Sequence, residues 1–112
     1  MMKWSTVEQL VLAESMDSFT GTEREMFWKN VSQCVITTLR MIGTVEESRF
    51  TDEECYNQWN YLNKEYSNRT RRQPIDILTL INLLRRKRID ELDREMNNVR
   101  SKLLRLQDLP SY

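Results

Sequence analysis

Residues 50–66 constrain the fold more than any other stretch, because they predict both where a helix begins and which of its faces is buried. Thr51 and Glu54 have the spacing of a capping box, in which each side chain accepts the backbone amide of the other residue. Phe50 and Cys55 are placed to form a hydrophobic staple across this start. The predicted buried face recurs at helical spacing and consists of Cys55, Trp59, Leu62 and Tyr66.

Two further capping-box spacings predict two helices upstream. Ser5 and Glu8 predict a first helix directly after a tryptophan, and Thr22 with Glu25 predicts a longer helix that ends near Gly43. The chain holds two glycines, two prolines and 30% charged residues, which is typical of a helical protein with few tight turns. The sequence therefore predicts an all-α fold.

The stretch around the third tryptophan also carries a family motif. Glu54, Cys55, Trp59 and Leu62 have the spacing E/Q-C-x-x-x-W-x-x-L, which resembles the third helix of Myb/SANT repeats. Two further tryptophans stand upstream, as in that family. The resemblance implies a three-helix Myb/SANT-like bundle over residues 1–66. Its expected core residues are Trp4, Trp28, Cys55, Trp59 and Leu62.

Two features count against the DNA binding for which Myb repeats are best known. Thirty residues lie between Trp28 and Trp59, so the turn that aims a recognition helix at the groove is expected to be enlarged. Residues 1–66 hold 11 acidic and 6 basic residues, whereas residues 67–112 hold 6 acidic and 11 basic residues. A net charge of −5 on the folded half opposes contact with phosphate, so DNA binding is the less favoured alternative.

A domain boundary is predicted at residues 67–74, which are polar and basic and end in Pro74. Residues 75–112 then form a C-terminal amphipathic helical segment. The apolar residues that follow Arg88 are out of phase with those that precede it, so the basic run before Ile89 is expected to mark a stutter or a break. The first apolar surface is interpreted as a second-partner surface and consists of Ile77, Leu80, Ile81 and Leu84.

From Ile89 onward, apolar residues step by three and four, which is the spacing of a coiled-coil seam. An isolated helix of this length is marginal in water, so the stripe needs the chain's own bundle, a second copy or a groove on another protein. The groove is favoured because Leu104 and Leu109 widen the stripe beyond a narrow zipper. The predicted partner-binding residues are Ile89, Leu92, Met96, Val99, Arg100, Leu103, Leu104, Leu106, Leu109 and Tyr112.

The sequence offers no constellation for catalysis or metal binding. It contains no histidine, and Cys34 and Cys55 both fall on predicted apolar helix faces, where a thiol behaves as a small hydrophobic group. We therefore expect no enzymatic activity, no cofactor and no metal. No apolar run is long enough to cross a membrane, and no signal-peptide pattern is present, so we expect an intracellular protein.

The whole layout resembles the small SANT-like adaptor subunits of the Mis complexes, which deposit the centromeric histone variant CENP-A. That resemblance implies a non-enzymatic adaptor in the nucleus, at centromere and kinetochore chromatin. It also implies two partners: a WD40 histone chaperone of the RbAp type for the C-terminal helix, and a Yippee-type Mis subunit for the SANT-like half. Contact with histones would be indirect. A Myb-type DNA-binding protein and a coiled-coil oligomerising chromatin subunit are the alternatives.

Overall fold

The computed structural model describes residues 3–71 and 75–107, and these residues form an all-helical fold without a β-strand. The expected all-α class is therefore confirmed. The described part of the chain contains four α-helices and one short 3-10 helix. They are α1 (Thr6–Ser18), α2 (Arg24–Arg40), η1 (Glu47–Phe50), α3 (Asp52–Thr70) and α4 (Ile77–Gln107).

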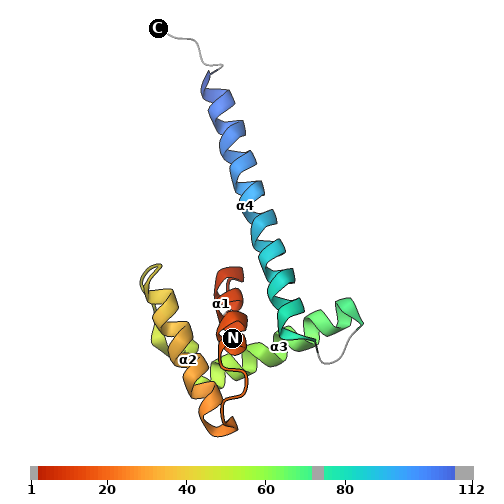
Figure 1. The fold of residues 1–112 in the computed structure, drawn as a ribbon. Coiled ribbons are helices and arrows are strands. Elements are labelled where there is room, and N and C mark those ends of the chain that lie inside the picture. The colour runs from red at the N-terminus through yellow and green to blue at the C-terminus, as the bar shows by residue number, and fades with distance from the viewer. Residues whose placement is uncertain (1–2, 72–74, 108–112) are drawn as a thin grey trace.

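Helix α1 is the central element, because it contacts α2, α3 and α4 (Figure 1). Its contacts with α4 are as extensive as those with α2. Beyond this bundle α4 continues alone, so the molecule measures 67 × 35 × 25 Å. The radius of gyration of the Cα atoms is 18.1 Å, whereas a compact chain of this length would have about 13 Å. The fold is a small core with a protruding helix.

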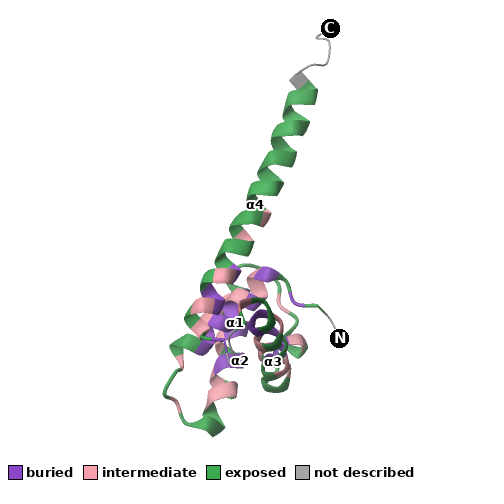
Figure 2. Ribbon diagram, turned by 90° about the vertical axis from the view of Figure 1, so that its right-hand side faces the viewer, coloured by how far each residue is buried: buried purple, intermediate pink, exposed green. Residues whose placement is uncertain are grey.

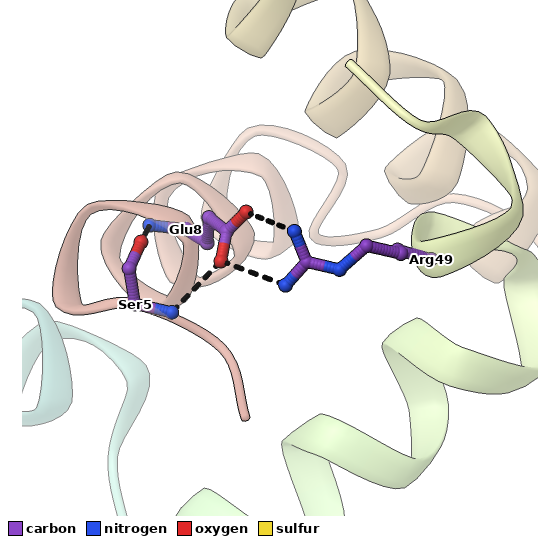
Figure 3. A network of polar contacts seen from close by, with 3 residues as sticks. All are labelled: Ser5, Glu8 and Arg49. Carbon is purple, nitrogen blue, oxygen red and sulfur yellow. Dashed lines mark hydrogen bonds and ion pairs between the residues drawn. The ribbon is translucent and has the colours of Figure 1, made fainter. Parts of the chain in front are cut away.

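The start of α1 confirms the first predicted capping box (Figure 3). The Glu8 amide donates to the Ser5 hydroxyl over 3.1 Å, and the Ser5 amide donates to the Glu8 carboxylate over 2.8 Å. The same carboxylate accepts two hydrogen bonds from the Arg49 guanidinium, at 3.1 and 3.2 Å. This paired geometry joins η1 to the start of α1, and both side chains are largely buried.

The start of α3 shows one of the two hydrogen bonds of the predicted capping box, the one to the Thr51 side chain. The Glu54 amide donates to the Thr51 hydroxyl over 3.2 Å, which makes Thr51 the N-cap. Phe50 and Cys55 are both buried, and the Cys55 thiol lies 3.6 Å from the Phe50 carbonyl oxygen. The Ser32 hydroxyl donates to that same carbonyl, so α2 and α3 are both tied to the end of η1.

The predicted start and end of the second helix are wrong. The N-cap of α2 is Glu23, whose side chain makes no capping hydrogen bond. Thr22 is instead part of the turn after α1, because its amide donates to the Phe19 carbonyl over 3.0 Å. The helix ends at Arg40, and Gly43 lies in the following loop without a left-handed backbone conformation.

The five predicted core residues are not equally buried. Trp4, Cys55 and Leu62 are buried, and the Trp4 ring packs edge-on against Phe50 with 4.9 Å between centroids. The other two tryptophans lie at the edge of the core and are only partly buried: Trp28 and Trp59. Trp28 packs edge-on against Tyr56, which is 48% exposed. An aromatic patch on the surface thus joins α2 to α3.

The core extends past residue 66, where the sequence predicted a domain boundary. Helix α3 continues to Thr70, and Arg71 then ends it in the left-handed conformation with φ of 58°. Ser67 is buried, and the Ile75 amide donates to the Asn63 side chain over 3.0 Å. Part of the expected linker is therefore helical, and the chain returns to the core directly after it.

Candidate docking surface on helix α4

Helix α4 has two halves with opposite exposure. Its first half enters the core: Leu80 and Leu84 are fully buried and Ile81 is 4% exposed, mainly against α1. Ile77 is partly buried beside them. The predicted second-partner surface formed by these four residues is therefore wrong, because the chain's own core occupies it.

The helix is continuous from Ile77 to Gln107, so of the two expectations for the basic run the break is wrong, whereas a stutter is compatible with the structure. The apolar residues change phase at the basic run because they move from one face of the continuous helix to another. At 3.6 residues per turn, the side chains from Ile89 onward are rotated by about a quarter of a turn from the core-facing side chains around Leu84. The core-facing side ends at Glu91, and the apolar stripe then follows a different side of the same helix.

Polar contacts fix α4 where it leaves the core. The Thr6 hydroxyl donates to the Glu91 carboxylate over 2.7 Å, and Arg85 pairs with Glu14 of α1 at 2.8 Å. Arg88 also contacts the Glu91 carboxylate, at 3.3 Å. The hydrogen bond from Thr6 lowers the pKa of Glu91, with further lowering from Arg88, while partial burial opposes both. Glu91 is thus held ionised between α1 and α4.

The distal half of α4 exposes its apolar side chains. Figure 2 shows the helix becoming exposed almost throughout once it passes the core. These residues are Ile89 (58% exposed), Leu92 (41%), Met96 (54%), Val99 (55%), Leu103 (53%), Leu104 (60%) and Leu106 (62%). Arg100 is exposed beside them, whereas Leu109 and Tyr112 lie outside the described residues. We call the described apolar residues from Ile89 to Leu106 the distal stripe.

The middle of the distal stripe forms a shallow depression. Leu92, Met96 and Val99 line it, with Glu95 and Arg100 at its edges, and its volume is about 410 Å³. Acidic and basic side chains therefore flank an apolar strip that no other described residue covers. Chemically, such a face can bury itself in an apolar groove or against another amphipathic helix.

The structure also forms a basic cleft that the sequence analysis did not predict. It lies between the start of α1, the end of α3 and the middle of α4, with a volume of about 800 Å³. Its cationic side chains come from distant parts of the chain: Lys3, Arg49, Arg69, Lys87 and Arg88. No local spacing could reveal this cleft, because only the packing of α4 on α1 brings these residues together.

The exposed side of α3 keeps its acidic start. Asp52 and Glu53 are exposed and Glu54 is half-buried, so the first turn of this helix presents negative charge to solvent. In the N-terminal turn these carboxylates interact favourably with the helix dipole. The same charges would meet a phosphate backbone with the wrong sign.

Among the described residues, no group of three or more His, Cys, Asp or Glu side chains could hold a metal ion. Within residues 3–71 and 75–107, no helix is both long and apolar enough to span a bilayer. Comparison with protein-family models, with curated proteins and with solved structures found no match for this chain.

Proposed function

We propose that this chain is a non-enzymatic adaptor subunit of a centromeric chromatin complex. In this proposal its distal stripe docks into the histone-helix groove of a WD40 chaperone of the RbAp type. Its core meets a Yippee-type Mis subunit, and the chain thereby links the chaperone to the Mis complex for CENP-A deposition in the nucleus. The arrangement of α1, α2 and α3 is taken as SANT-like, with the enlarged connection between α2 and α3 as its departure from the family.

The exposure of the distal stripe is the observation that supports this proposal most. Seven large apolar side chains on one protruding helix are between 41% and 62% exposed. The described part of the core does not cover them, because the stripe is rotated away from the face that packs on α1. An amphipathic helix with this spacing is the type of ligand that a helix-binding groove accepts.

The charge of the distal helix fits the same partner. Arg100, Lys102 and Arg105 accompany the stripe over its outer turns and are all exposed. A groove that binds a basic histone helix needs an acidic rim, and basic side chains beside an apolar strip complement such a rim. The predicted contacts from Leu109 and Tyr112 would extend this surface beyond the described residues.

The second partner is assigned to the core because the apolar residues of α4 that were expected to bind it are covered by the chain's own core. Two of the places where the core exposes apolar side chains are candidates for this contact. One is the aromatic patch of Trp28 and Tyr56, and the other is the end of α2, where Met41 is 82% and Ile42 69% exposed. Either place gives a Yippee-type subunit an apolar surface remote from the distal stripe.

A pull-down with purified WD40 chaperone tests the docking step. The double variant Leu103→Asp with Leu106→Asp is expected to lose capture completely, since two carboxylates would enter an apolar groove. Its melting temperature should stay within a few degrees of the wild type, because both positions lie outside the core. The matched control is Asn98→Asp with Ser101→Asp, which adds the same charge on the opposite side of α4, at two exposed positions, and should be captured normally.

Two results would remove the proposal. Normal capture of the leucine double variant would show that the distal stripe is not the docking face. Tight, sequence-dependent DNA binding in a mobility-shift assay at near-physiological salt would favour the Myb-type alternative. The acidic first turn of α3 predicts instead that any DNA binding is weak and disappears as salt is raised.

A further inference from the structure

The protruding part of α4 divides into two segments of opposite charge. Residues 89–97 contain four acidic residues and one basic residue, whereas residues 98–107 contain three basic residues and no acidic residue. The boundary between the two segments falls between Met96 and Val99, in the middle of the distal stripe. It coincides with the shallow depression that these two residues line.

An antiparallel copy of this helix matches both the stripe and the charges. When the two helices cross between residues 97 and 98, Ile89 lies opposite Leu106, Leu92 opposite Leu103, and Met96 opposite Val99. All three layers are apolar, and all six side chains are exposed in the single chain. The depression at the centre would receive the Met96 and Val99 side chains of the second copy.

The flanking charges are complementary in the same register. The positions beside the seam are occupied by Asp93 and Arg100 on one flank and by Glu95 and Lys102 on the other. In an antiparallel pair each flank faces the same flank of the other helix, so Asp93 meets Arg100 and Glu95 meets Lys102. Two-fold symmetry gives each contact twice. All four side chains are exposed, and Glu95, whose carboxylate lies 3.9 Å from the Arg88 guanidinium, would exchange that long contact for Lys102 of the second copy.

We infer that the free protein self-associates through the distal stripe as an antiparallel helix pair. A parallel pair would also oppose Glu95 to Arg100, but it would set acidic segment against acidic segment and basic against basic, with the two helix dipoles aligned. It would also bring both cores to the same end. The antiparallel pair places the cores at opposite ends and each acidic segment against a basic one.

This inference concerns the regulation of the proposed docking site and rests on the proposed function only for its biological role. The self-paired helix would hide the stripe, so that chaperone binding and self-association exclude each other. The seam spans fewer than three heptads, and we therefore expect a weak dimer that a tighter partner displaces. Self-pairing would protect the apolar stripe from non-specific association before assembly.

Sedimentation equilibrium of the full chain, from low to high micromolar concentration, tests the self-pairing. The wild type should shift from monomer to dimer, with no larger species. The variants Arg100→Glu with Lys102→Glu, and Asp93→Lys with Glu95→Lys, should each dimerise at least tenfold more weakly, because all four flanking contacts become repulsive. A one-to-one mixture of the two variants should dimerise like the wild type, because all four contacts of the mixed pair are attractive: two are the original contacts and two have their signs exchanged.

Disulfide trapping tests the orientation. In a Cys34→Ser background, which retains only the buried Cys55, the variants Leu92→Cys and Leu103→Cys are oxidised separately and as a mixture. An antiparallel pair predicts a linked dimer in the mixture and little in either variant alone, because residue 92 lies opposite residue 103. Efficient linking of each variant with itself would show a parallel pair and overturn the arrangement.

The outcomes separate this inference from the proposed function. A chain that stays monomeric at every concentration but is captured by the chaperone overturns self-pairing and leaves docking intact. A chain that dimerises in the predicted register but is not captured supports self-pairing and removes the docking proposal. When both hold, adding chaperone should convert the dimer into a complex containing one copy of this chain.

Discussion

At the scale of single residues, the carbonyl group of Phe50 is where the segments around α3 meet. The Ser32 hydroxyl donates to it, the Cys55 thiol lies next to it, and the Phe50 ring packs against Trp4. Burial raises the pKa of Cys55 to about 12, with smaller contributions from the carboxylates of Asp52 and Glu54. The thiol is therefore a neutral core group and not a nucleophile.

The raised pKa of Cys55 predicts how stability depends on alkaline pH. The native pKa lies above the ordinary value of 9.0, so this thiol's contribution is complete below about pH 9 and is lost as pH rises toward 12. Between about pH 8 and about pH 10.5 the free energy of unfolding should fall more steeply for the wild type than for Cys55→Ala. Chemical denaturation at several pH values measures both slopes.

The comparison of slopes isolates Cys55 because Tyr66, whose pKa is also raised by burial, is present in both proteins. Equal slopes would contradict the prediction. Thiol labelling of the native chain gives a second readout. The half-buried Cys34 should react readily, whereas Cys55 should react only when the chain unfolds.

At the scale of helices, local sequence predicted the starts of α1 and α3 because their caps are made within four residues. Ser5 and Thr51 each follow a large aromatic side chain that enters the core, so capping and burial agree at these two positions. Thr22 has the same local spacing, but the turn after α1 uses its amide. A local turn that directly follows α1 therefore overrode the capping signal.

The role of the first half of α4 could not be predicted from local sequence. Its apolar face was recognised, but the element that covers it, α1, is about 70 residues away in the chain. Periodicity shows that a face needs burial and does not show what buries it. The same reason explains why the distal stripe was found by its spacing, while the basic cleft and the Thr6–Glu91 contact were not.

A matched pair of leucines in α4 tests its division into two halves. Leu84→Ala should lower the free energy of unfolding by about 2–5 kcal/mol, because it leaves a cavity in the core. Leu103→Ala should change it by less than about 0.5 kcal/mol, because that side chain is exposed in the monomer. Denaturation is measured at low protein concentration, so that self-association does not contribute. Similar losses for both variants would contradict the division.

At the scale of the whole molecule, the folding unit is larger than residues 1–66. Four residues after the predicted boundary complete the core, and they are Ile75, Leu80, Ile81 and Leu84. Each buried aliphatic side chain contributes about 1.5–3 kcal/mol relative to exposure to solvent. The burial free energy of the four side chains together is comparable to the net stability of a small domain, which is about 5–15 kcal/mol.

Truncation tests this boundary directly. A chain that ends after residue 95 keeps the core and the contacts of Glu91, so it should unfold cooperatively at close to the full-length melting temperature. A chain that ends after residue 66 lacks one wall of the core and should not fold cooperatively. Circular dichroism with thermal melting compares the two. Cooperative folding of the shorter chain would show that α4 is dispensable to the core.

The hydrogen bond between Thr6 and Glu91, which holds α4 against α1, has a geometric consequence. Residues 89–107 belong to one uninterrupted helix that is fixed where it leaves the core. A partner bound at its C-terminal end is therefore held about 28 Å from the core. Bulky bodies could then occupy the tip and the core together without collision. The length of this helix and the direction in which its stripe faces are coupled. Removing seven residues shortens the helix and keeps that direction, whereas removing two rotates the stripe about the helix axis by about 200°, to the opposite side.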